Sequence, residues 1–129
     1  MFSRNTEKLE SFIGPNTIFK GNISTKGTIR IDGRLEGDVE ADWVILGDKS
    51  YLLGNATARG IVVGGTVDGN LSAKELIEIK QKGQVKGNIS TKKLIVAEGG
   101  VLEGKTAMLK DEKTKEIEFS QETQTYGGG

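Results

Sequence analysis

Residues 29–42 read IRIDGRLEGDVEAD, with a hydrophobic residue or glycine at every odd position and a charged residue at every even one. Such alternation is typical of β-structure that has one face in a core and the other in water. Fourteen residues are more than twice the usual length of a strand. Glycine at the inward positions Gly33 and Gly37 removes a side chain where the chain has to turn. The stretch therefore predicts short strands joined by tight corners.

The segment around Gly37 recurs along the chain. Its form is apolar–any–Gly–polar–small or apolar, and the six copies are FKGNI, LEGDV, LLGNA, VDGNL, VKGNI and LEGKT, with glycines at 21, 37, 54, 69, 87 and 104. The spacings are 16, 17, 15, 18 and 17 residues, so the mean is 83/5, or about 17. A second apolar element lies between the copies, in the pairs Ile29/Ile31, Val44/Leu46, Ile61/Val63, Ile77/Ile79 and Ile95/Ala97. Six copies at one period predict a solenoid, in which each turn stacks on the previous one.

A turn of about 17 residues has room for three strands of about four residues each. We therefore expect an all-β fold, a single parallel β-helix of about six triangular rungs. The sixfold apolar rhythm of left-handed hexapeptide helices does not hold here, which favours a right-handed coil. We expect the β-helical domain to span residues 14–109, with a short amino-terminal tail over 1–13. Residues 110–129 are polar and end in three glycines, which predicts a disordered tail.

The composition excludes several classes of function. The 129 residues contain no cysteine and no histidine, which argues against disulfide frameworks, Ser-His-Asp triads and most zinc sites. The β-helical acyltransferases and carbonic-anhydrase-like trimers need histidine as well. We therefore expect no enzyme, no catalytic residue, no cofactor and no metal. Lys plus Arg equal Asp plus Glu at 18 each, so the net charge does not indicate nucleic acid as a partner. With no signal peptide or long apolar run, we expect the chain in the cytoplasm.

Two motifs have simpler readings within the repeat. Residues 99–106, GGVLEGKT, match the Walker A pattern, but LEGKT is the sixth copy in register and the long helices of a P-loop fold are missing. Four Asn-X-Ser/Thr triplets begin at Asn22, Asn55, Asn70 and Asn88. We interpret them as turn asparagines, which would form an asparagine ladder along one edge when the rungs stack in register.

The ends of such a solenoid are candidate interaction sites. An uncapped β-helix exposes unpaired backbone groups and a slice of apolar core at each end. This predicts end-to-end association into a filament; the alternative is that the two tails fold over the ends. The predicted polymer interface consists of residues from the terminal rungs: Phe12, Ile13, Ile18, Phe19, Val101, Leu102, Met108 and Leu109.

The six copies and the stretch IRIDGRLEG (29–37) resemble the bactofilins, over residues 14–108. This resemblance implies a right-handed triangular β-helix that polymerises without nucleotide into non-polar filaments. It further implies a scaffold on the inner face of the cytoplasmic membrane, in cell shape, placement of cell-wall enzymes or polar organisation. The implied partners are copies of itself, membrane lipid, and cell-wall enzymes or polar proteins. The alternative function is a monomeric adaptor that binds a protein along one face of the rod.

Two smaller groups of residues complete the candidate sites. The start MFSR resembles the bactofilin membrane-attachment segment, and the expected membrane contacts are Met1, Phe2, Arg4 and Lys8; the alternative is that this segment caps the first rung. A predicted basic strip consists of Lys80, Lys82, Lys86, Lys92 and Lys93. It would contact anionic lipid or a protein partner; the alternative is that these lysines are an ordinary solvated face. Trp43 is expected at a corner, partly exposed.

Overall fold

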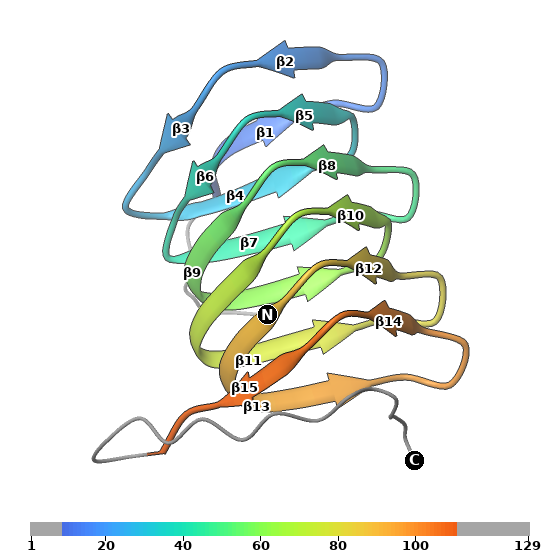
Figure 1. Cartoon of the computed structure of the whole chain (residues 1–129). Coiled ribbons are helices and arrows are strands. Elements are labelled where there is room, and N and C mark those ends of the chain that lie inside the picture. Colours follow the sequence, from blue (N-terminus) through green and yellow to red (C-terminus); the bar gives the residue numbers. More distant parts are fainter. Residues whose placement is uncertain (1–8, 111–129) are drawn as a thin grey trace.

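In the computed structural model, which describes residues 9–110, the chain coils into a solenoid of six turns (Figure 1). Each turn contains three short strand segments, and no helix occurs in the described part of the chain. Every strand pair is parallel, and each strand pairs with its equivalents in the turns before and after it. The structure thus confirms an all-β parallel solenoid of three-sided turns. The right-handed sense stays a prediction.

The three sides of the coil are called faces A, B and C, in chain order within a turn. Face A contains β1 (Leu9–Ile13), β4 (Thr28–Ile31), β7 (Trp43–Leu46) and the second halves of β9 (Ala56–Val63), β11 (Leu71–Ile79) and β13 (Ile89–Val96). Face B contains β2 (Ile18–Lys20), β5 (Arg34–Glu36), β8 (Tyr51–Leu53), β10 (Thr66–Asp68), β12 (Gln84–Lys86) and β14 (Val101–Glu103), stacked in that order (Figure 1). Face C contains β3 (Ile23–Ser24), β6 (Val39–Glu40), the first halves of β9, β11 and β13, and β15 (Thr106–Met108).

The core is the interior of the coil. The odd-numbered residues of the stretch 29–42 point inward as predicted: Ile29, Ile31 and Leu35 have no exposed surface, and Val39 is 2 % exposed. Their equivalents in the other turns lie in the same columns because the parallel register places like positions above one another. Because side chains alternate along each strand, every second residue of a strand points into this narrow interior, which is filled mainly with Ile, Val, Leu and Ala.

The corner between faces B and C is the repeated glycine motif. All six marker glycines have a positive φ, between 139° and 154°. A Cβ on Gly54 would lie 2.0 Å from the carbonyl oxygen of Gly37 in the turn before. From the inward residue of face B to that of face C the distance is four residues in every turn, as from Leu35 to Val39. This corner therefore has a fixed length and a fixed geometry.

The other corners vary in length. The corner between faces A and B has two residues in two turns, at 32–33 and 64–65. It has four residues in the other four turns, at 14–17, 47–50, 80–83 and 97–100. The bend between faces C and A differs by one residue between turns, and the register of β11 shifts between Ala73 and Leu76. These two corners absorb the uneven spacings of the repeat.

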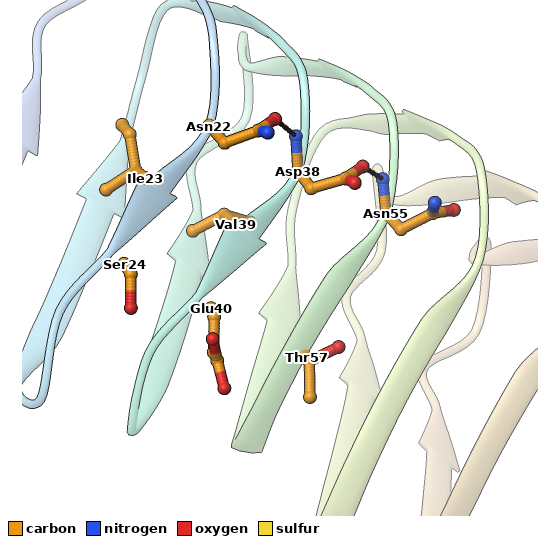
Figure 2. Close-up of a pocket in the computed structure, with 8 residues that line it drawn as sticks. All are labelled: Asn22, Ile23, Ser24, Asp38, Val39, Glu40, Asn55 and Thr57. Carbon is orange, nitrogen blue, oxygen red and sulfur yellow. Dashed lines mark hydrogen bonds between the residues drawn. The ribbon is translucent and has the colours of Figure 1, made fainter.

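The asparagine ladder expected from the glycosylation-like triplets is present. The backbone N–H of Asp38 donates to Oδ1 of Asn22 (2.9 Å), and the N–H of Asn55 donates to Oδ1 of Asp38 (3.1 Å), as Figure 2 shows. Three further bonds of this kind continue the ladder through Asn70 and Asn88. Each acceptor belongs to one turn and each donor to the next, so the ladder ties successive turns together along the glycine corner.

Two boundaries differ from the sequence analysis. The solenoid begins at Leu9, not at residue 14, because residues 9–13 form β1 and pair with β4. The last apolar pair is Leu94/Val96, not Ile95/Ala97, since Leu94 pairs with Ile77 and Val96 with Ile79. Trp43 lies at the start of β7 beside the C–A bend and is partly exposed, as predicted. The membrane contacts predicted within residues 1–8 and the disorder predicted for 111–129 lie outside the described residues.

Candidate polymer interface

The first turn exposes apolar side chains at the amino-terminal end of the rod. Leu9 and Phe12 of β1 are each 55 % exposed, and Ile18 of β2 is 64 % exposed. Phe19 occupies the inward column of face B, where its equivalents Leu35 and Leu52 are fully buried, yet it is 37 % exposed. The open side of the first turn therefore presents part of the core together with outward hydrophobic residues.

The last turn does the same at the carboxy-terminal end. Val96 stands in an inward column, below Ile79, and is 37 % exposed although Ile79 has no exposed surface. Ile95 and Val101 are exposed to a similar degree. Leu102 packs against the core but keeps part of its surface. Both ends of the rod thus combine an open slice of core with an apolar rim.

The predicted interface residues occupy these two ends, with one correction. Phe12, Ile18, Phe19 and Val101 are exposed, and Leu102, Met108 and Leu109 are partly exposed. Ile13 is only 7 % exposed, because it pairs with Ile31 in the inward column of face A. It belongs to the core and is not available to a partner.

Three exposed residues of the ends were not predicted, namely Leu9, Ile95 and Val96. Leu9 was missed because the domain was expected to start later. Ile95 and Val96 lie in the run Leu94-Ile95-Val96-Ala97, in which every residue is apolar. An unbroken apolar run fits either phase of a strand, and only the pairing with β11 shows which residues point outward.

The asparagine ladder ends in the last turn. At the carboxy-terminal end, Oδ1 of Asn88 accepts from the N–H of Lys105 (3.2 Å). Lys105 holds the sixth ladder position, and its ammonium group has no lone pair with which to accept a further bond. The ladder therefore stops at Lys105, and the exposed surface of the last turn consists of apolar side chains and strand edges.

The five lysines predicted to form a basic strip do not line up along the rod. Lys80 and Lys82 lie in the A–B corner after β11, and Lys86 ends β12 on face B. Lys92 and Lys93 lie at the C–A bend within β13. The lysines therefore surround the last two turns on different sides, because residues close in sequence pass around the whole perimeter of a solenoid within one turn.

Two arginines form pairs with acids and aromatic rings on the outside of the coil. Arg59 donates from Nε and Nη2 to the two carboxylate oxygens of Asp42, both at 2.9 Å, and its guanidinium lies 5.7 Å from the ring centre of Trp43. The hydrogen bonds from Arg59 hold the pKa of Asp42 below its usual value, and those to Asp42 raise the pKa of Arg59 further. Arg34 stacks over Tyr51 at 4.5 Å in the same manner. These pairs brace successive turns and form no reactive constellation.

A shallow hollow lies on face C over the first three turns (Figure 2). The residues that line it are Asn22, Ile23, Ser24, Asp38, Val39, Glu40, Asn55 and Thr57. Its amide and carboxylate oxygens at Asn22 and Asp38 already accept ladder hydrogen bonds. The hollow is therefore part of the outer surface of the sheet, and the open ends remain the stronger candidate site.

Residues 99–106, which match the Walker A pattern, form the last A–B corner, β14 and the start of β15. No group of three or more potential metal-binding side chains occurs among residues 9–110, and that part of the chain has no helix able to span a membrane.

Comparison with known proteins shows the family of the chain. The family model that matches residues 11–107 is the bactofilin model, described as polymer-forming cytoskeletal. The chain belongs to the bactofilin family. Family members are structural, polymer-forming proteins and not enzymes. This bactofilin is therefore a polymer-forming cytoskeletal protein, as its resemblance implied.

Two individual bactofilins are similar to the chain. Bactofilin BacP of Myxococcus xanthus is 25 % identical over 97 residues, which are 74 % of this chain and 40 % of BacP. The chain thus spans less than half the length of this curated relative. A bactofilin of Thermus thermophilus, solved by cryo-electron microscopy as double helical filaments, matches with a TM-score of 0.66 and 25 % identity. The match covers 74 % of this chain and 98 % of the other.

Proposed function

We propose that this bactofilin polymerises end to end through its two terminal turns, without nucleotide, into non-polar filaments that serve as a membrane-associated scaffold. The observation that carries the proposal is the distribution of exposed hydrophobic side chains. Of the eight large hydrophobic residues exposed among residues 9–110, seven lie in the first or last turn, and Leu53 is the exception. Surfaces of this kind are usually protected in monomeric proteins.

In a non-polar filament like ends meet, so the first turn of one subunit would contact the first turn of the next, and last turns would contact each other. Phe12, Ile18 and Phe19 would provide the apolar surface of the amino-terminal contact. Val101 and Leu102 would provide that of the carboxy-terminal contact, with Met108 and Leu109 beside them. The strand edges of the terminal turns would pair across each contact. Because the driving force is burial of apolar surface and of strand edges, no nucleotide is needed to form the contact.

Attachment to the inner face of the cytoplasmic membrane would come from the amino-terminal segment. Met1 and Phe2 would insert into the interface and Arg4 and Lys8 would lie against anionic lipid. One such segment binds weakly, but a filament presents many copies, so attachment becomes firm through multivalency. Filaments held in this way would organise cell-wall enzymes or polar proteins, in cell shape or polar organisation. Pelleting with anionic vesicles should be lost when residues 2–8 are deleted, and unchanged pelleting would refute the attachment.

Electron microscopy of the purified protein tests the polymer directly. Filaments should form without nucleotide. They should disappear in Phe12→Lys or Val101→Lys, while the far-ultraviolet circular dichroism of the β-fold is retained. Leu53→Lys is the matched control because Leu53 is similarly exposed, at 40 %, but lies in the third turn. Only monomers at high concentration would overturn the proposal and favour the monomeric adaptor instead.

A further inference from the structure

The outer surface of face A carries an apolar column that the end-to-end contact does not explain. The parallel register places six outward residues above one another, one from each turn: Phe12, Arg30, Ile45, Val62, Glu78 and Ile95. Four of the six are hydrophobic. Ile45 and Val62 lie in the middle turns, and both are only partly buried. An outward position in a sheet with one wet face is ordinarily polar.

The outward columns of the other faces differ. On face B one outward column is Ile18, Arg34, Tyr51, Thr66, Gln84 and Val101, and its two aliphatic residues lie in the terminal turns. The other column is Lys20, Glu36, Leu53, Asp68, Lys86 and Glu103, and Leu53 is the exposed large hydrophobic residue of the four inner turns. On face C the column is Ser24, Glu40, Thr57, Ser72, Ser90 and Ala107. Face A thus has the pattern of a sheet that is covered on both sides. Parallel strands covered on both sides read as nearly continuous hydrophobic runs, and β7 reads Trp43-Val44-Ile45-Leu46.

The order of the six residues is self-complementary. From the first turn to the last the column reads apolar, positive, apolar, apolar, negative, apolar. When a second copy of the column is laid beside the first in the reverse order, Arg30 of one copy faces Glu78 of the other, and each hydrophobic residue faces a hydrophobic residue. Two copies packed face to face with their long axes antiparallel would therefore place Arg30 opposite the partner's Glu78 twice, and Ile45 opposite the partner's Val62 twice. A contact between two equal patches related by a two-fold axis requires this kind of pattern.

The charged residues at these positions are available for such pairing. Arg30 is 44 % exposed and uses Nε and Nη2 for Asp32, which leaves three of its five guanidinium N–H groups. Glu78 is 31 % exposed, and its Oε2 lies 3.8 Å from Nζ of Lys80, which is beyond hydrogen-bond distance. Both side chains can thus reach a partner across the spacing of about 10 Å between packed sheets.

We infer that the outer surface of face A is the lateral contact between two filament strands, in which each subunit packs against an antiparallel subunit of a second strand of this same chain. The inference rests on the proposed end-to-end polymer, and two observations support it. The column begins at Phe12 and ends at Ile95, which belong to the exposed rims of the terminal turns, so the column reaches both ends at which subunits would meet. The similar bactofilin of Thermus thermophilus was solved as double helical filaments, and a double helix has two strands.

The size of the patch indicates that the contact needs the polymer. Four residues of strand across six turns cover about 13 Å by about 24 Å, from the usual rise per residue and spacing between strands. That is less than half of the roughly 800 Å² per partner in a stable interface. Single subunits would therefore not pair, whereas strands with many aligned patches would.

Electron microscopy of filament width tests the inference, with two sets of variants. Ile45→Asp should still form filaments, but the fraction that is double should fall at least tenfold. Leu53→Asp, in the same turn on face B, should leave that fraction unchanged. Arg30→Glu and Glu78→Arg should each reduce the double fraction, and the double variant Arg30→Glu/Glu78→Arg should restore it, since the swap recreates both opposite pairs only in an antiparallel contact.

Each contrary result has a distinct meaning. Wild-type filaments that are always single, or an unchanged double fraction in Ile45→Asp, would overturn the lateral contact and leave end-to-end polymerisation standing. Failure of the charge swap to restore pairing would overturn the antiparallel arrangement. If Ile45→Asp kept double filaments but lost pelleting with phosphatidylglycerol vesicles, lipid would be the occupant and the inference would be wrong. Absence of all wild-type filaments would refute the proposed function itself.

Discussion

Alanine at Gly54 should destabilise the solenoid much more than alanine at Gly21, although the two glycines hold the same position in the repeat. Their φ angles are similar, 146° and 139°, so both substitutions incur the same backbone strain, about 1–3 kcal/mol. Their surroundings differ. The added Cβ at Gly54 would lie 2.0 Å from the carbonyl oxygen of Gly37, whereas at Gly21 it would meet only the ring of Phe19, at 3.4 Å from Cε1 and 3.9 Å from Cζ.

The structure gives the size of the additional penalty. Restoring an ordinary 3.4 Å contact at Gly54 requires the two turns to separate by about 1.4 Å, that is, 3.4 minus 2.0. Hydrogen bonds beside the corner join these same turns, from the N–H of Gly37 to the oxygen of Leu53 (3.0 Å) and from the N–H of Val39 to the oxygen of Asn55 (2.9 Å). Losing two such bonds costs about 1–2 kcal/mol each when the groups are left poorly satisfied. Gly54→Ala should therefore lower the free energy of unfolding by about 2–4 kcal/mol more than Gly21→Ala.

The assay is urea unfolding followed by far-ultraviolet circular dichroism. Both variants should be measured in a Phe12→Lys/Val101→Lys background, in which a charge at each end keeps chains unassembled. Equal losses in the two variants, within about 0.5 kcal/mol, would show that backbone strain alone explains the glycines. The stacking of one corner on the next would then have no energetic role.

Three further outcomes are expected from the same geometry. Asn70→Ala removes the acceptor for the N–H of Asn88 and should lower the free energy of unfolding by about 1 kcal/mol. Lys105→Ala is the control, because Lys105 holds a ladder position but accepts no hydrogen bond there, and it should change the free energy of unfolding by less than about 0.5 kcal/mol. Arg59 lowers the pKa of Asp42 in the folded chain. The pair therefore stabilises the fold above the ordinary carboxyl pKa of about 4, and this stabilisation is lost as the pH falls through the lower pKa of the folded state. Asp42→Asn should remove this part of the acid dependence, which is below about 1 kcal/mol for so exposed a pair, as measured by urea titrations at several pH values. Filament formation by Lys105→Ala should match the wild type with and without ATP in light scattering, and a nucleotide effect that this variant abolishes would contradict the repeat reading of residues 99–106.

The regular part of the fold was predictable from the sequence because one physical constraint acts at every turn. A glycine with positive φ is needed wherever the B–C corner of one turn lies against that of the next, so the glycines mark the period. The alternation around Leu35 then assigns the inward residues without reference to the rest of the chain. The asparagine ladder followed from the same reasoning, since residues that share a corner in register share a column.

The parts that could not be predicted depend on pairing. Leu9 reads as tail because β1 lacks the glycine motif, and its place is fixed only by contact with β4. Ile95 lies in a run whose phase is ambiguous. Ile13 was assigned to the interface by its position near the end, but the register with Ile31 buries it. The lysines between 80 and 93 looked like a strip because distance along a sequence does not show on which side of a coil a residue lies.

The variable A–B corner has a consequence for the use of this chain as a scaffold. Its length is two residues in some turns and four in others. A difference of two residues keeps the same side chains of the next strand pointing inward, whereas a difference of one residue would turn them outward. Extra residues in even number at 80–83 should therefore extend outward without disturbing the columns of either neighbouring face. A peptide tag inserted there would repeat once per subunit along the polymer. The solenoid thus contains, in each turn, a place where new surface can be added without altering its core.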